Sequence, residues 1–539
     1  MADAPDNPMD GAIGPGISRR MFLAGAASIP LAMLLENGLS ALPGGSKASG
    51  TQAACDLPQE VLLRIQRGYR ADRCGQLMIV PHGFNYVSGG ISHSTPWGYT
   101  QNVPMFWYGP GVIRGGTIVN RYVTSADIAP TVAKLAGFTD FDAPDGEVMD
   151  EALVPGAKPK LVVVLVWDAG GRYVLSQWPG AWPRLKGLKP KGTWYEHASI
   201  GSNPSNTAPI HASIGTGAFP RTHGVVDNIQ RFSDGKLLDP WSRGPGVMLS
   251  PTLAEEYQEA MGQKAIVGMC GTLNWHLGML GQGTANGGPR TLAVLKDKSE
   301  DSSTSHHRWG LPDGLADFYR FPGYVNDLPP LLHYFDVADA SDGKRDGRWR
   351  GHSIDAAQGG FHTPSRVPFQ TRAIQEVIER EGFGHHDEPD LLFLNYKIID
   401  EIGHEYSASS LEMHDTIAVQ DAYLGSFIAF LNRQVGVGNW AMLVTADHGH
   451  TARPSVSGGT PIGEGALHAE LVSRFDDGDS AAVFPKLRPI WLNVNENELR
   501  ANGHSLEEVS SYIAGYRQNG QKMFDAAFAS SLLPHLNCS

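Results

Sequence analysis

Several features are scarce in this chain of 539 residues, and each absence narrows its possible function. Four cysteines are too few for a disulfide scaffold and lack the spacing of a zinc ribbon. Charged residues make up 18% of the chain, and no basic run accompanies the net charge of -13, which argues against binding to a nucleic-acid backbone. Because no stretch of about 18 apolar residues occurs, we expect no stable membrane span and a soluble mature protein.

The chain does contain enough apolar residues for a large core. Hydrophobic residues make up 41% and aromatic residues 9%, which excludes a disordered chain. The 64 glycines and 36 prolines indicate long surface loops. The length allows one large α/β domain or two to three smaller ones.

Residues 1–54 have the pattern of an export signal and a linker. Arg19 and Arg20 stand before a modestly apolar stretch that runs to Leu35, and a segment rich in Gly, Ser and Ala follows. This pattern predicts a twin-arginine signal and a periplasmic or extracellular protein. The alternative is an arginine pair that precedes a buried helix by chance.

Short apolar runs without alternation predict strands that are buried on both faces of a parallel sheet. We expect these strands at 76–81, 104–108, 160–167, 264–270, 390–395, 440–445 and 489–492. Helical patterns lie between them at 125–136, 251–261, 371–380, 411–431 and 505–516. The sequence therefore predicts an α/β fold with a mostly parallel sheet covered by helices on both faces. The polar, Gly- and His-rich segment of about 284–365 is predicted to be an insertion or cap.

Acidic residues and histidines follow three of these strands. Asp168 and Asp447 end two apolar runs, and Asp400 lies five residues after a third. His448 and His404 stand close to them. Because ligands bind outside the carboxyl ends of parallel strands, we expect these side chains to converge there. Oxygen and imidazole ligands without thiolates suit Zn²⁺ or Mn²⁺. The alternative for any single Asp is a helix N-cap.

Thr207 lies just before Pro209, a residue that favours the first turn of a helix. A hydroxyl at a helix N-terminus is close to unpaired N–H groups, which favour phosphate. The alternative is that Thr207 only caps the helix, and the local sequence is compatible with both roles.

Together these motifs resemble the alkaline phosphatase superfamily, and most closely its type I phosphodiesterase/nucleotide pyrophosphatase branch. The resemblance covers nearly all of residues 55–539 outside the insertion. The matching motifs are Asp168, Thr207 with His211, the segment from Thr216 to Asn228, the segment from Asp400 to His404, and the segment from Ala446 to Gly449.

The resemblance implies a site for two divalent metal ions, with zinc favoured. One ion would be held by Asp168, Thr207, Asp447 and His448, and the other by Asp400, His404 and a third histidine. Thr207 would be the nucleophile, activated by its metal. Asn228 would bind a phosphoryl oxygen.

The third histidine departs from the family order. His450, His468 and His504 lack the usual surrounding motif, which stands instead around His93. Residues 55–155 as a whole resemble the C-terminal segment of the family's catalytic domains, placed here at the N-terminal side of the catalytic core. We therefore expect a circular permutation, with residues 156–539 as the catalytic core and His93 as the third histidine. A disulfide between Cys55 and Cys538 would fit this order, and a local Cys55–Cys74 pair is the alternative.

The substrate prediction depends on the segment 270–279. Phosphomonoesterase relatives place Lys and Arg there, whereas this chain has Asn274 and His276, which we expect to face the substrate. The change favours diesters, pyrophosphates or phosphonates over monoester dianions. A sulfatase is disfavoured, because His362 stands at the nucleophile position of the nearest matching string, and no Gly-x-Ser-x-Gly elbow of a serine esterase occurs. The sequence thus predicts an exported phosphodiesterase or nucleotide pyrophosphatase that acts on small phosphoesters. The alternatives are a phosphomonoesterase and a non-catalytic binding protein of the same fold.

Overall fold

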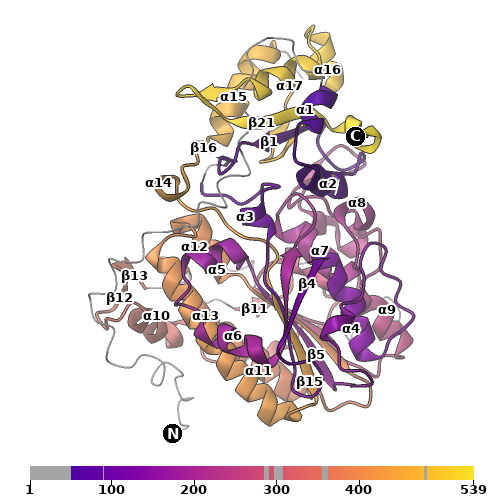
Figure 1. The fold of residues 1–539 in the computed structure, drawn as a ribbon, viewed down its shortest axis with the longest axis vertical. Coiled ribbons are helices and arrows are strands. Elements are labelled where there is room, and N and C mark those ends of the chain that lie inside the picture. The colour runs from indigo at the N-terminus through magenta and orange to yellow at the C-terminus, as the bar shows by residue number, and fades with distance from the viewer. Residues whose placement is uncertain are drawn as a thin grey trace.

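The structure is a computed structural model that describes residues 50–88, 90–283, 291–296, 308–312, 314–354, 362–478 and 482–538. The predicted twin-arginine motif lies outside the described residues. The chain forms a large lower part around a central sheet and a smaller upper lobe that contains the C-terminal segment (Figure 1).

The central sheet has nine strands, and most neighbouring pairs are parallel. Strands β11 and β3 run antiparallel to their neighbours. The prediction of a mostly parallel sheet is therefore confirmed. In spatial order the strands are β11 (Trp309–Gly310), β10 (Thr291–Lys296), β9 (Val267–Cys270), β14 (Asp390–Tyr396), β5 (Leu161–Trp167), β15 (Trp440–Thr445), β3 (Met105–Tyr108), β6 (Thr193–Ser199) and β4 (Thr117–Thr124).

Helices cover both faces of this sheet (Figure 1). The alternate residues Leu161 and Val163 of β5 pack into one hydrophobic cluster, and their neighbours Val162 and Val164 pack into another. Both sides of the strand are buried, which explains its continuous apolar run. The first face is covered by α5 (Arg172–Gln177), α6 (Pro183–Leu188), α11 (Arg366–Glu381), α12 (Ile398–Tyr406) and α13 (Leu411–Leu431); the second is covered by α4 (Ile128–Ala136), α7 (Thr207–Thr216) and α9 (Leu253–Ala260).

A second, antiparallel sheet forms the upper lobe. Its strand order is β17 (Lys486–Leu487), β18 (Trp491–Asn493), β1 (Leu77–Pro81) and β21 (Phe524–Ala529). The expectation that 76–81 and 489–492 belong to a parallel sheet is therefore wrong. The reason is that β1 is also covered on both faces: Leu77 packs toward α15 (Glu464–Phe475) and α17 (Leu506–Ala514), and Met78 packs toward α1 (Gly50–Cys55) and α2 (Gln59–Gly68).

The segment 284–365 is not wholly an insertion, which corrects the prediction. Its strand β10 pairs in parallel with β9 inside the central sheet, and β11 extends that edge. The strand could not be predicted because its apolar run stands between polar stretches of sequence. Other described elements of this segment are α10 (Phe335–Ser341), β12 (Arg348–Trp349) and β13 (His352–Ser353).

Shorter elements complete the described parts of the chain. They are α3 (Gly98–Gln101), α8 (Pro220–His223), α14 (Pro454–Ser457), α16 (Glu496–Ala501), and the two-residue strands β2 (Tyr86–Val87), β7 (Gln230–Arg231), β8 (Leu237–Leu238), β16 (Pro461–Ile462), β19 (Arg517–Gln518) and β20 (Gln521–Lys522). Among the helices of the described residues, none combines the length and the apolar composition needed to cross a membrane.

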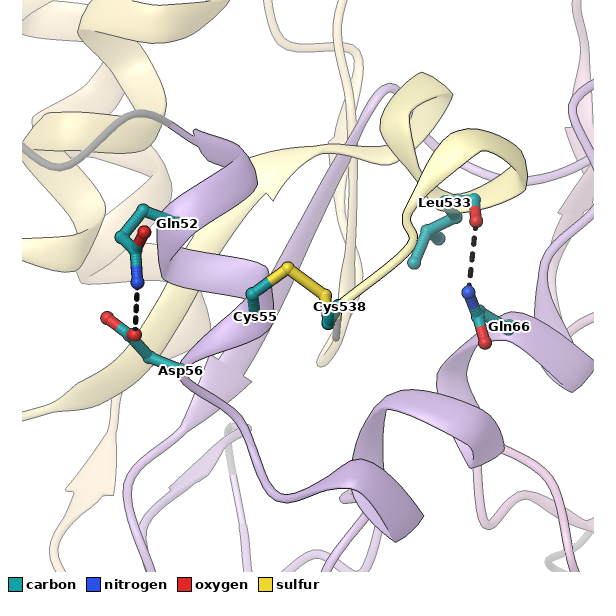
Figure 2. The surroundings of a disulfide bond; sticks show 6 residues. All are labelled: Gln52, Cys55, Asp56, Gln66, Leu533 and Cys538. Carbon is teal, nitrogen blue, oxygen red and sulfur yellow. Dashed lines mark hydrogen bonds between the residues drawn. A yellow bond between two sulfur atoms is a disulfide. The ribbon is translucent and has the colours of Figure 1, made fainter.

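A disulfide joins the first and last parts of the described chain. Figure 2 shows Cys55 at the end of α1 bonded to Cys538, which lies 483 residues further along the sequence. The local alternative does not form, since Cys74 remains a buried thiol. Burial raises the pKa of that thiol to about 12, which leaves it almost fully protonated and a poor nucleophile for disulfide exchange.

Replacing Cys55 by Ser should lower the free energy of unfolding by about 2–4 kcal/mol, because the unfolded chain regains the freedom that the cross-link removes. The decrease is measured by urea denaturation with and without dithiothreitol. The reductant should destabilise the wild-type protein and leave the C55S variant unchanged. Equal effects of dithiothreitol on both proteins, or a Cys55–Cys74 peptide found by mass spectrometry, would contradict the pairing.

Candidate active site

Three adjacent parallel strands place the candidate site at one edge of the central sheet. Asp168 follows β5 directly, Lys397 follows β14 directly, and Asp447 lies two residues after β15. Because these strands end at the same edge, their side chains meet there. Asp400 reaches the same place from the first turn of α12.

The first group of possible metal ligands, which we term the His93 cluster, consists of His93, Asp400, His404 and His450. His93 Nε2 lies 3.2 Å from His404 Nε2 and 3.3 Å from Asp400 Oδ1. The Nδ1 atoms of His93 and His404 each donate to a backbone carbonyl, those of Ser205 and Ile91, at 2.7 Å. In their neutral forms both rings therefore direct an Nε2 lone pair toward the carboxylate oxygen. Lone pairs that face one another in this way fit a bound cation.

The remaining candidates for the third histidine differ from His93. His450 Nδ1 accepts from Thr451 N at 2.9 Å, so the proton of the neutral ring is on Nε2 and that atom has no lone pair for a metal. The ring has space only because residue 403 is a glycine, whose Cβ would lie 2.5 Å from His450 Cδ2. His468 contacts the carbonyl of Phe484, and His504 lies on the surface of the upper lobe.

The second group, which we term the Asp447 cluster, consists of Asp168, Asp447 and His448, all fully buried. His448 Nε2 lies 3.4 Å from Asp447 Oδ2 and 3.7 Å from Asp168 Oδ1, and its Nδ1 donates to Gly449 O. No hydrogen-bond partner in the described chain reaches Asp447 Oδ2 or His448 Nε2. Burial and the Asp168 carboxylate raise the pKa of Asp447 well above its ordinary value. These nitrogen and oxygen atoms fit a divalent cation of the zinc type.

Thr207 is the first residue of α7 and is almost fully buried. The N-cap position belongs to Asn206, so Thr207 is not the capping residue. Ala208 N donates to Asn228 Oδ1 at 2.9 Å, which places Asn228 beside the start of the helix. Asp227 Oδ1 accepts from both Asn206 Nδ2 and Asn228 N and fixes this arrangement.

The two predicted substrate contacts, His276 and Asn274, have partners within the chain. His276 is fully buried, and its Nδ1 accepts from Thr272 N and Leu273 N. Its proton is therefore on Nε2, which lies 3.5 Å from Asp168 Oδ2. The Asn274 side chain donates to Asp239.

Asp168 is held by an amide. Asn395 Nδ2 donates to Asp168 Oδ2 and contacts His211 Nε2, each at 2.9 Å. His211 Nδ1 donates to Thr207 O, so its one available lone pair is taken by Asn395. Although Asp168, His211 and His276 lie close together, the Nε2 atom of His211 is therefore taken by Asn395, and the Nε2 atom of His276 carries a proton, so neither ring offers a lone pair to a third metal ion.

Lys397 is the site residue that the sequence analysis missed. Its Nζ contacts Asp168, Asp400 and Thr207. Burial by itself lowers the pKa of Lys397, but the Asp168 and Asp400 carboxylates outweigh burial and raise it above its ordinary value. Lys397 in turn holds the pKa of Asp400 well below its ordinary value despite burial. Its position directly after β14 was the one available signal.

The backbone next to Asp168 has an unusual conformation. Ala169 has φ of 58°, in the left-handed region that non-glycine residues rarely adopt. This conformation lets Ala169 N donate to Asp447 Oδ1 at 3.0 Å. The hydrogen bond joins the ends of β5 and β15, and such local strain is common where a site requires it.

Comparisons with known proteins find several similar chains. The alkaline phosphatase PhoV of Synechococcus elongatus is 26% identical over 341 residues, which are 55% of this chain and 60% of PhoV. The alkaline phosphatase PafA of Elizabethkingia meningoseptica is 25% identical over 340 residues, 54% of this chain and 60% of PafA. The chain thus spans less than two thirds of the length of either relative.

The crystal structure of wild-type PafA aligns with a TM-score of 0.46 and 16% identity, and covers 70% of this chain and 85% of that chain. The family model of type I phosphodiesterase / nucleotide pyrophosphatase matches residues 162–535, well over half of the sequence. On this match, the chain belongs to the type I phosphodiesterase / nucleotide pyrophosphatase family.

Proposed function

We propose that this protein is an exported, metal-dependent hydrolase of phosphoric esters that uses Thr207 as its nucleophile. One observation carries the proposal. The Thr207 hydroxyl lies 3.0 Å from Lys397 Nζ, which also contacts Asp168 of the Asp447 cluster and Asp400 of the His93 cluster. The hydroxyl therefore lies beside both groups of possible metal ligands, at the N-terminus of a helix that favours a phosphate.

Both clusters would hold a divalent ion, for which zinc is favoured by the donor atoms. His93, Asp400 and His404 would hold one, and Asp168, Asp447 and His448 the other, with Thr207 beside it. When bound, such ions neutralise charge on the attacking and leaving oxygens and make water a better nucleophile.

The side chains of this protein have separate roles in that reaction. Thr207 Oγ1 attacks phosphorus and forms a phospho-threonine, which water then hydrolyses. Asn228 donates from its amide nitrogen to a phosphoryl oxygen, since its Oδ1 is already bonded to Ala208 N. Asn395 keeps the Asp168 carboxylate in place with a hydrogen bond from its Nδ2.

Phosphodiesters and nucleotide pyrophosphates are the substrates that we favour. The segment 270–279 contains no Lys or Arg to balance the second charge of a monoester. The alternative is a phosphomonoesterase, because the relatives PhoV and PafA are named alkaline phosphatases.

The proposal has two further parts, a circular permutation of the chain and its export. The family model begins at residue 162, whereas His93 and strands β3 and β4 precede it and lie in the site or in the central sheet. This supports a circular permutation in which residues 55–155 complete the catalytic domain.

A disulfide suits an oxidising compartment, which supports export through the predicted twin-arginine signal.

Thr207→Ala should reduce turnover by roughly a thousandfold or more, because the covalent nucleophile is lost while the carboxylate and histidine ligands of both ions remain. Turnover of p-nitrophenyl esters and metal content by mass spectrometry are the measurements. Thr207→Ser should keep part of the activity, and Thr216→Ala at the other end of α7 is the matched control. A T207A protein with wild-type turnover would refute a catalytic role for this hydroxyl.

His93→Ala should reduce the metal content from two ions to about one per chain, because the His93 cluster loses one of its three ligands. His450→Ala and His468→Ala should keep both ions, the former because its Nε2 is protonated and the latter because it is remote. Atomic mass spectrometry of dialysed protein gives the count. If H450A or H468A loses an ion while H93A keeps two, the order of segments is the usual one of the family and the chain is not circularly permuted.

The ratio of kcat/KM for bis(p-nitrophenyl) phosphate to that for p-nitrophenyl phosphate should favour the diester on the order of tenfold or more. A monoester dianion lacks the charge-assisted contacts that two cationic side chains would provide. Both rates are measured on the same zinc-loaded preparation. A ratio below one would instead identify a phosphomonoesterase.

A further inference from the structure

Lys397 carries a buried positive charge at the centre of the candidate site. Its side chain is 5% exposed. Nζ lies 2.8 Å from Asp168 Oδ1, 2.7 Å from Asp400 Oδ2 and 3.0 Å from Thr207 Oγ1. The contacts to Asp168 and Thr207 are hydrogen bonds, and the contact to Asp400 is an ion pair. One cation thus connects a carboxylate of each cluster to the same hydroxyl oxygen.

The contact with Thr207 distinguishes Lys397 from a lysine that only balances charge. Lys160, at the opposite end of the sheet, directs its protons to the backbone carbonyls of His386 and Asp387. Lys397 instead donates a proton to the side-chain hydroxyl oxygen of Thr207. Because Thr207 Oγ1 accepts that proton, its own hydrogen points elsewhere and one lone pair is left for phosphorus.

We propose that Lys397 is a catalytic residue that stabilises negative charge on the Thr207 oxygen, an inference that rests on the proposed function. In the first step, Thr207 Oγ1 donates an electron pair to phosphorus and its hydroxyl proton passes to water. The bond from phosphorus to the leaving oxygen breaks with its electron pair, and that oxygen takes a proton from water. Lys397 keeps its three protons throughout and acts through its charge and its hydrogen bond.

The same contact serves the second step. Water attacks the phosphorus of the phospho-threonine and loses a proton to solvent. The bond from phosphorus to Thr207 Oγ1 then breaks with its electron pair, and the oxygen is again beside the ammonium group before it takes up a proton. A donor fixed in a buried site needs no reorganisation as charge develops, which makes it more effective than water.

Lys397 acts on the nucleophile and not on the substrate. Its buried ammonium group is engaged by two hydrogen bonds and an ion pair within this chain, which direct it to the nucleophile and the carboxylates and not to a phosphoryl oxygen. Its removal should therefore lower the rate of the chemical step and leave substrate binding nearly unchanged. This separates Lys397 from the Lys and Arg pair that phosphomonoesterase relatives use to hold the substrate.

The test replaces Lys397 by Met and, separately, by Gln, whose amide can still donate to the carboxylates if the Met variant does not fold. Single-turnover reaction with bis(p-nitrophenyl) phosphate, followed by mass spectrometry of the Thr207 peptide, measures formation of the covalent adduct. We expect the rate to fall on the order of 10²–10³-fold. KM should stay within about threefold of wild type and both metal ions should be retained, and Lys160→Met should match the wild-type protein.

Each other outcome would overturn the inference. An unchanged adduct rate would make Lys397 a structural ion pair, and a raised KM at an unchanged rate would make it a substrate ligand. Loss of an ion would assign it to metal retention, and failure of both variants to fold with zinc present would assign it to the fold. An active T207A protein would refute the proposed function as well, whereas an inactive T207A with an active K397M would refute this inference alone.

Discussion

Mutual repulsion among buried carboxylates is the constraint on which this site depends. Asp168, Asp400 and Asp447 are removed from water at one edge of the central sheet, and each ionised group costs several kcal/mol to bury without a partner. The Lys397 ammonium compensates Asp168 and Asp400, while Asp447 keeps an oxygen without a donor in the described chain. The charge that remains uncompensated provides the free energy with which such a site binds divalent cations, and the fold tolerates the cost because central strands hold two of the three groups.

The backbone around each histidine of the candidate site determines which ring nitrogen carries the proton. His93, His404 and His448 each place a proton on Nδ1 because a carbonyl accepts it, so each offers Nε2 to the centre of the site. His450 and His276 have the opposite arrangement, since backbone N–H groups donate to their Nδ1 atoms. These five imidazoles thus divide into two classes by the position of the ring proton, and the sixth, His211, has a proton on Nδ1 but its Nε2 is taken by Asn395. Residue type and proximity do not make that distinction.

Local sequence patterns encode part of the fold and part of the candidate site. Asp168 and Asp447 could be found because each follows a buried run, and α13 has the predicted bounds. The strand β1 could not be assigned to its sheet, because burial on both faces gives the same apolar run in either sheet. Lys397 belongs to no recognisable sequence motif. Its role depends on its contacts with Asp168, Asp400 and Thr207. The position of His93 could be inferred only from the family resemblance, since it lies 307 residues before Asp400 along the printed sequence.

Strand pairing and hydrogen bonds join the segment that contains His93 to the rest of the candidate catalytic domain. Strand β3 lies between β15 and β6, so the sheet is continuous only through this segment. Ser205 Oγ donates to His93 O at 2.6 Å, two residues before Thr207. A ligand that binds only the folded site stabilises all elements that form it. A cation held by His93, Asp400 and His404 would therefore couple the front of the chain to α12, while the disulfide ties that same front to the C-terminal segment. Both connections oppose separation of residues 55–155 from the core, which is what a circularly permuted single catalytic domain requires.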